Sequence, residues 1–199
     1  IPKEMVKSAR HVHLSSAMLL NGMDGGGTEK LFLTAHQNGA TTSLDTANAS
    51  GGCIEKIDRV LYNTDIFLPS LYEAQKLTGR DTPEEIAEYL KKYSFKVLVI
   101  KLGKEGCYVK SNTESFYLPA FKSGNVCDTT GAGDCFVAAF LSSYLKGYSP
   151  YECAITANTA SRFCISKIGA DPGFENFEEI VKFIKNNKKF YDTSRVCNF

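Results

Sequence analysis

Residues 128–134 read Asp-Thr-Thr-Gly-Ala-Gly-Asp, and an apolar run from Cys135 to Leu145 follows at once. Large apolar residues recur in this run at helical spacing, so we expect a helix that begins at or just after the glycines. A glycine inside a helix costs about 1 kcal/mol relative to alanine. Two of them at a helix start therefore indicate that something approaches the backbone closely. The unpaired N–H groups of a first helical turn, together with the helix dipole, suit an anion such as phosphate.

Two carboxylates, Asp128 and Asp134, bracket this turn. Beside a bound anion Asp134 would be out of place unless it takes part in chemistry. We therefore hypothesise phosphoryl transfer, with Asp134 as the base on the accepting hydroxyl. Each carboxylate alone has a structural explanation, because an aspartate in a first turn complements the helix dipole and Asp128 can begin a turn. Neither explanation accounts for the Gly-Ala-Gly between them, which favours a functional role.

The composition is that of an ordinary globular domain, with 199 residues, 43% hydrophobic residues and a formal net charge of +1. This charge gives no reason to expect nucleic-acid binding, and the apolar runs are far shorter than the ~20 residues that a membrane span needs. The seven cysteines are scattered and form no C-x-x-C pair, so we expect reduced thiols in a cytoplasmic protein. The chain begins with Ile1, which indicates a processed N-terminus or a piece of a longer chain.

Short apolar segments alternate with helical patterns along the chain. Strands are predicted at residues 11–16, 40–44, 65–68, 97–100, 107–110 and 115–118. Helices are predicted at residues 28–37, 54–61, 70–77, 82–93, 135–145 and 151–165, with a last one from residue 176. This alternation favours an α/β fold with a mostly parallel central sheet. Residues 1–187 are expected to form one domain, and residues 188–199 a loosely held tail.

Ligands of such sheets bind at the carboxyl ends of the strands. Asp45, Ser70, Gly103 and the 128–134 loop each follow a predicted strand, so we expect them to line one rim of the sheet.

The chain lacks several familiar catalytic motifs. It contains no G-x-x-x-x-G-K-[ST] sequence, which excludes a P-loop enzyme, and no H-E-x-x-H or G-x-S-x-G sequence. Gly131 and Gly133 match the start of the dinucleotide-binding pattern G-x-G-x-x-G, but Phe136 stands at the third glycine position. The segment before them is polar rather than a hydrophobic strand, so a dinucleotide site is disfavoured.

Residues 128–141 (Asp-Thr-Thr-Gly-Ala-Gly-Asp-Cys-Phe-Val-Ala-Ala-Phe-Leu) resemble the C-terminal signature of the ribokinase-like carbohydrate kinases, also called the phosphofructokinase-B family. The resemblance extends to residues 101–106, to Glu-x-x-x-Leu-Thr-Gly at 73–79, and to 157–158 and 168–170, so that it covers roughly residues 1–185. It implies a ribokinase-like three-layer sandwich with helices on both faces of a mostly parallel sheet. Members of this family are longer, so the N-terminal strands and the lid would be missing here.

The resemblance also implies roles at matching positions. Asp134 would be the catalytic base, and the amides of Gly131, Ala132 and Gly133 would form the anion hole. ATP would be contacted by Lys101, Gly103, Gly106 and Asn158. Water-organised Mg²⁺ would lie near Ser70 and Glu73, where Ser70 replaces the usual asparagine; this change predicts altered nucleotide affinity rather than lost activity.

A monovalent cation, K⁺, would bind beside the anion hole, mostly through backbone carbonyls. The matching positions are Asp128, Thr130, Cys164, Lys167, Gly169 and Gly173. Asp45 and Asn48 would touch the substrate at a strand end, with a strand-terminating turn as an equal alternative.

We therefore expect the nucleotide-binding and catalytic portion of an ATP-dependent sugar kinase that uses Mg²⁺ and K⁺ and acts on a small-molecule sugar. One alternative is a nucleoside or other small-alcohol kinase of the same superfamily. Another is a non-catalytic regulator that binds nucleotide or sugar, although the intact Asp134 argues against it. A homodimer through the absent lid region is a further expectation, and the activity of this chain alone stays open.

Overall fold

The computed structural model describes residues 1–47, 53–121 and 125–198, and it divides into two compact units. The N-terminal unit holds residues 1–101 and 110–115, and the C-terminal unit holds residues 102–109 and 116–199. The proposed single domain over residues 1–187 stays a prediction.

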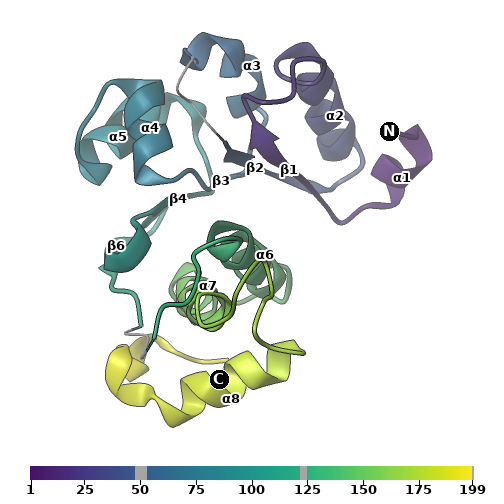
Figure 1. Ribbon diagram of the computed structural model, residues 1–199. Helices are drawn as coiled ribbons and strands as arrows, with labels where there is room; N and C mark the ends of the chain where they lie inside the picture. Colours follow the sequence, from purple (N-terminus) through teal and green to yellow (C-terminus); the bar gives the residue numbers. More distant parts are fainter. Residues whose placement is uncertain (48–52, 122–124, 199) are drawn as a thin grey trace. The chain divides into compact units, whose positions relative to one another are not determined.

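Six strands form one sheet, in which they follow the same order as in the sequence (Figure 1). Their bounds are β1 His11–Ala17, β2 Thr41–Thr46, β3 Ile66–Phe67, β4 Val97–Lys101, β5 Cys107–Ser111 and β6 Ser115–Leu118. The pairings from β1 to β4 are parallel, which confirms the expected sheet type. Asp45 was expected just after a strand but lies inside β2. An irregularity in β1 lets Ala17 pair with Thr46, and this pairing extends β2 past the carboxylate.

The described residues of the N-terminal unit form these helices: α1 Lys3–Ser8, α2 Gly26–Gln37, η2 Ile54–Lys56, α3 Asp58–Leu61, α4 Leu71–Thr78, α5 Pro83–Leu90 and η3 Lys91–Tyr93. Figure 1 shows α2 to α5 along one side of strands β1 to β4. The predicted capping box at Thr82 is confirmed, since its side chain accepts from the Glu85 amide and the Glu85 side chain accepts from Thr82. Gly79 ends α4 in the left-handed conformation, as its position predicted.

The core of the N-terminal unit consists of side chains that the apolar strand and helix patterns single out. Its largest fully buried members are Phe32, Leu44, Ile57, Leu61, Ile66, Phe67, Leu68, Ile86, Leu90 and Ile100. This burial fixes the strand ends that carry polar side chains at the carboxyl edge of the sheet.

In the C-terminal unit, the residues that the structure describes form the helices η4 Gly103–Glu105, α6 Ala132–Leu145, α7 Pro150–Cys164, α8 Phe177–Asn186, η5 Lys188–Phe190 and η6 Thr193–Arg195. Helices α6 and α7 pack closely against each other. α6 begins at Ala132, at the glycines where the helix start was predicted, so Asp134 lies within its first turn. None of the helices in the described part of the chain is long and apolar enough to cross a membrane.

The C-terminal tail is held more firmly than predicted. Glu152, at the start of α7, is 1% exposed and accepts hydrogen bonds from the backbone amides of Cys197 and Asn198, both at 2.7 Å. The Tyr151 hydroxyl accepts a further bond from the Asp192 amide at 2.9 Å. The prediction of a loosely held tail is therefore wrong for these residues, because a buried carboxylate far away in sequence supplies their hydrogen-bond acceptor.

Candidate active site

The N-terminus of α6 carries no side-chain cap. Gly131 is its N-cap residue, in the left-handed conformation with φ 78°, and it has no side chain to offer. By contrast, Ser70, Thr82, Ser149 and Asn176 cap α4, α5, α7 and α8 with side-chain oxygens. The Ala132 amide donates to the Thr129 carbonyl at 3.2 Å. In the described part of the chain, the amides of Gly131, Gly133 and Asp134 have no hydrogen-bond acceptor, so three unpaired donors remain at this helix start.

Asp134 is exposed at this first turn. Among the residues that the structure describes, none donates a hydrogen bond to its carboxylate or pairs with it as a salt bridge. A carboxylate without protein partners beside unpaired amides can accept a proton from a bound hydroxyl.

The position of this turn is fixed by the packing of α6 on α7. Phe136, Val137, Phe140 and Leu141 are buried on one side of α6, as their spacing predicted. The Ser161 hydroxyl on α7 donates to the Ala132 carbonyl at 2.9 Å. The amide donors are therefore held in place by a side chain that the sequence did not mark as functional.

Gly131 tolerates no larger residue in this arrangement. A Cβ there would lie 3.1 Å from the Ala170 Cβ and 3.7 Å from the Cys164 Sγ, and the positive φ adds strain for any L-residue. The sequence predicted that a glycine is needed here because a ligand approaches the backbone. The structure gives a second reason, since Gly131 also packs against the loop after α7.

Asp128 joins the helix start to that loop. Its Oδ1 accepts from the Thr130 amide at 3.0 Å and from the Thr130 hydroxyl at 2.8 Å, and its Oδ2 accepts from the Gly169 amide at 2.8 Å. The hydrogen bonds from Thr130 and then Gly169 hold the pKa of the Asp128 carboxyl below its ordinary value. Asp128 therefore forms a turn, which was the alternative role expected for it, and both of its carboxylate oxygens accept hydrogen bonds from N–H or O–H groups.

The other predicted cation positions differ in their surroundings. The Cys164 thiol donates to the Thr130 carbonyl at 3.4 Å, and Gly173 (φ 73°) packs on the Phe163 carbonyl. The Lys167 side chain is exposed. Oxygen atoms are the ligands that hard cations prefer, so the lysine and cysteine side chains do not suit K⁺, and its binding through Asp128 and main-chain carbonyls stays a prediction. The described residues contain no group of three or more His, Cys, Asp or Glu side chains that could hold a metal ion.

Cys135 lies next to Asp134 and exchanges a hydrogen bond with Cys164, and burial raises the pKa of Cys135 to about 12. The thiolate is the reactive form of a cysteine, so the raised pKa gives no support for a nucleophilic role of Cys135.

The predicted nucleotide residues Gly106 and Asn158 meet at the end of β6. A Cβ on Gly106 (φ 98°) would lie 2.6 Å from the Ala120 nitrogen, so only glycine fits there. The Asn158 side chain is 5% exposed and donates to the Pro119 carbonyl at 3.2 Å. Gly103, with φ 59°, has open space around its Cα. Asn158 thus supports the chain that faces Gly106, and its contact with a nucleotide stays a prediction.

A polar cluster lies at the carboxyl edge of the sheet in the N-terminal unit. The Lys101 ammonium donates to both Asp45 oxygens, at 2.8 and 2.7 Å, and both side chains are largely buried. Burial raises the pKa of Asp45 to about 6, against the lowering effect of the Lys101 charge. Lys101 was expected to contact nucleotide, but its charge is directed at the residue expected to contact substrate.

Glu73 belongs to the same cluster. Its Oε2 accepts from the Ser70 amide at 2.8 Å and from the Thr46 hydroxyl at 3.2 Å, while the Ser70 hydroxyl accepts from the Glu73 amide. No partner of Oε1 is found among the described residues, so a carboxylate oxygen with a fixed orientation remains available to a hydrated Mg²⁺. Thr46 was not predicted as a site residue, because no motif surrounds it. The predicted substrate contact of Asn48 lies outside the described residues.

Comparison with known proteins places these features in a family. The pattern of the pfkB family carbohydrate kinases matches residues 1–176. An uncharacterized sugar kinase of Archaeoglobus fulgidus is 36% identical over 172 residues, which cover 84% of this chain and 67% of that protein. Arabidopsis thaliana ribokinase, solved with ribose and ATP, superposes with a TM-score of 0.76 and 26% identity over 92% of this chain and 58% of that one.

A candidate ribokinase II of E. coli in complex with ATP and Mg²⁺ superposes with a TM-score of 0.82 and 25% identity, over 94% of this chain and 62% of that one. The chain therefore has the ribokinase fold and spans about three fifths of these two structures.

Proposed function

Because this chain belongs to the pfkB family of carbohydrate kinases, we propose that it carries the catalytic part of an enzyme that phosphorylates a sugar hydroxyl with ATP. The observation that carries the proposal is the N-terminus of α6. Three unpaired amides and an exposed carboxylate stand together there, on a helix that no side chain caps. This arrangement supplies the two things that phosphoryl transfer needs from a protein, which are donors for the transferred group and an acceptor for the hydroxyl proton.

In the proposed reaction the hydroxyl oxygen bonds to the γ-phosphorus while the bond from that phosphorus to the bridging oxygen breaks, and ADP leaves. Asp134 takes the hydroxyl proton. In a loose transition state this proton is lost late, so a weak base is sufficient, and such assistance contributes about 10²–10⁴-fold in rate.

The amides of Gly131, Gly133 and Asp134 would donate to the oxygens of the transferred phosphoryl group. The Ala132 amide, which the family resemblance included in the anion hole, already has an acceptor. We therefore assign the anion hole to the amides on either side of it. Their fixed positions require no rearrangement as negative charge is redistributed.

ATP would be bound by the Gly103–Gly106 turn and near Asn158, since the glycines leave the backbone accessible. Glu73 would hold hydrated Mg²⁺ through its free Oε1, and the metal when bound would neutralise phosphate charge. Ser70 is occupied as the cap of α4, which explains how the unusual serine can be tolerated. The related structure with ATP and Mg²⁺ supports this part of the proposal.

K⁺ would be bound by Asp128 and the carbonyls of the neighbouring loops. The replacement of K⁺ by Na⁺ in the assay buffer tests this assignment, because the two ions have the same charge and different sizes. We expect a lower kcat in Na⁺; equal rates in both ions would exclude a K⁺ requirement.

Asp45 remains our candidate for a substrate contact. Its oxygens accept from Lys101, so a sugar hydroxyl would have to share them through the remaining lone pairs. The measurement is ADP release by the complete protein over a panel of monosaccharides and nucleosides, at matched ATP and Mg²⁺. Turnover of a monosaccharide supports the proposal, turnover of nucleosides alone would move it to a nucleoside kinase, and no turnover of any hydroxyl compound would refute it.

A further inference from the structure

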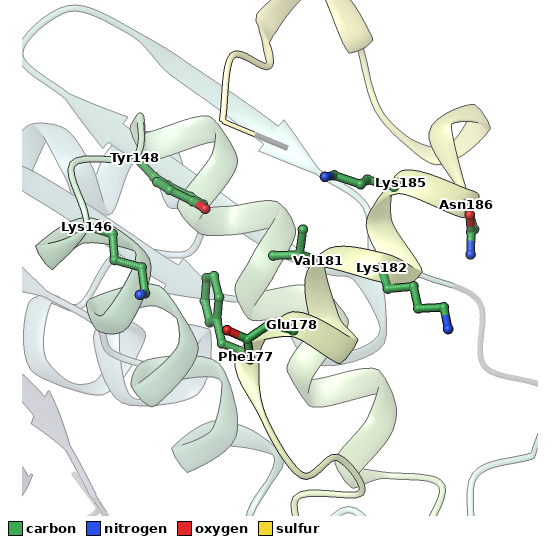
Figure 2. Close-up of a pocket in the computed structure, with 8 residues that line it drawn as sticks. All are labelled: Lys146, Tyr148, Phe177, Glu178, Val181, Lys182, Lys185 and Asn186. Carbon is green, nitrogen blue, oxygen red and sulfur yellow. The ribbon is translucent and has the colours of Figure 1, made fainter.

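A pocket of about 510 Å³ lies in the C-terminal unit, where the end of α6 meets α8 (Figure 2). We call it the α8 pocket; it is lined by Lys146, Tyr148, Phe177, Glu178, Lys182 and Lys185. Its volume is within the range of about 300–1,000 Å³ typical of small-molecule sites. Nothing in the proposed reaction uses it.

This pocket lies at the opposite end of α6 from the candidate active site. Asp134 is in the first turn of the helix, and Lys146 is its C-cap residue. Twelve residues at about 1.5 Å each separate them by roughly 18 Å along the axis. A molecule in the α8 pocket therefore does not occupy the anion hole.

The pocket is positively charged. Three lysines and one glutamate line it, so the lining residues carry a formal charge of +2. Within the described part of the chain, none of the three lysines forms a salt bridge, although Glu178 lines the same pocket. Lys185 also lines a neighbouring cavity with Lys188, so the positive potential continues along this end of α8 and can attract anions.

Figure 2 shows the ammonium group of Lys185 and the hydroxyl of Tyr148 directed into the pocket, while Lys146 runs toward Phe177 at one end of it and Lys182 extends away. The Lys146 Nζ lies 5.1 Å from the centre of the Phe177 ring, which holds the ammonium against the aromatic face. The Tyr148 and Phe177 rings pack edge to face at 6.1 Å and form an apolar wall.

We propose that the α8 pocket binds the phosphate monoester of a small organic molecule. A phosphate monoester carries about −1.5 to −2 charge at pH 7, which is opposite in sign to the formal charge of the lining residues. The aromatic wall would contact the organic part, which inorganic phosphate lacks. The pocket is thus a second site, separate from the one that the proposed kinase reaction uses.

Binding to the complete protein can be measured by isothermal titration calorimetry with ribose 5-phosphate, AMP, orthophosphate and neutral ribose as probes. The double variant Lys146→Gln/Lys185→Gln removes two of the three lysine charges that line the pocket. The matched control is Lys30→Gln, an exposed lysine on α2. We expect the double variant to weaken ester binding at least tenfold, because charge-assisted hydrogen bonds each contribute about that factor, and we expect the control to leave it unchanged.

Active-site binding is distinguished by a third variant, Gly131→Ala, which strains the helix start that forms the proposed anion hole and should leave binding in the α8 pocket intact. Ester binding that survives loss of both lysines would overturn the proposal. So would equal affinity for orthophosphate and the esters, or the absence of saturable ester binding below ~10 mM. Binding that depends on the two lysines supports the site even if the protein phosphorylates no sugar, so the two proposals fail independently.

Discussion

Replacement of Lys101 by methionine is expected to destabilise the protein strongly, because it leaves the Asp45 carboxylate buried without its cation. The ammonium lies 2.8 and 2.7 Å from the two Asp45 oxygens, and the side chains are 14% and 9% exposed. Removal of one partner from a buried pair costs about 3–5 kcal/mol. For a chain of this size, each kcal/mol lowers Tm by about 2–4 °C, so the expected loss is roughly 6–20 °C.

The cost should depend on pH in a definite direction. The folded-state pKa of Asp45 is raised from 3.8 to about 6 by burial. Between about pH 4 and pH 6, Asp45 therefore keeps its proton in the folded protein but has lost it in the unfolded chain. The contribution of this group to stability therefore falls as pH rises through that window. Loss of the Lys101 charge raises the pKa further, so the variant should lose more stability at pH 8, where Asp45 must be charged, than at pH 5, where it can be neutral.

Thermal unfolding followed by circular dichroism at both pH values measures the effect. Lys91→Met is the matched control, since Lys91 pairs with Glu88 at 3.2 Å with 69% and 67% of the side chains exposed, and such pairs contribute about 0–1 kcal/mol. Asp45→Asn combined with Lys101→Met should recover part of the loss. If Lys101→Met costs no more than Lys91→Met, or costs more at pH 5 than at pH 8, the buried pair does not behave as described.

Two further predictions concern the C-terminal unit. Gly173→Ala should cost about 2 kcal/mol or more in thermal unfolding, because φ is 73° and the new Cβ would lie 2.8 Å from the Phe163 carbonyl carbon. Gly147→Ala, with φ 85° and open space, should cost only about 1–2 kcal/mol, and equal losses would refute the steric part. Glu152→Gln should weaken the tail's charge-assisted bonds at 2.7 Å and speed amide hydrogen exchange in residues 191–198. Unchanged exchange there would mean that Glu152 does not anchor the tail.

The features that the sequence predicted well have local causes. The caps at Thr82 and Asn176 and the left-handed Gly79 depend on residues three or four positions apart. The glycine turn at the start of α6 likewise combines a backbone requirement with an apolar stripe in one continuous segment. Periodicity and turn chemistry are sufficient for such features.

The features that the sequence did not predict depend on contacts between distant segments. Lys101 and Asp45 are 56 residues apart, and no spacing rule links them. Glu152 holds a tail that lies 45 residues further along the chain. The position of Asn158 in the family motif does not reveal whether its side-chain amide contacts a nucleotide or donates to the Pro119 carbonyl. Only three-dimensional packing decides which partner a polar side chain finds.

The central claim is that Asp134 is the catalytic base at an anion-binding helix start. The most direct test is the kcat of Asp134→Asn in the complete protein, with ATP affinity measured in parallel by calorimetry. Asparagine keeps the size and the backbone amide, so ATP binding should change little while kcat falls by about 10²–10⁴-fold. A variant with unchanged kcat would show that the proton goes elsewhere, and it would contradict the mechanism proposed for this site.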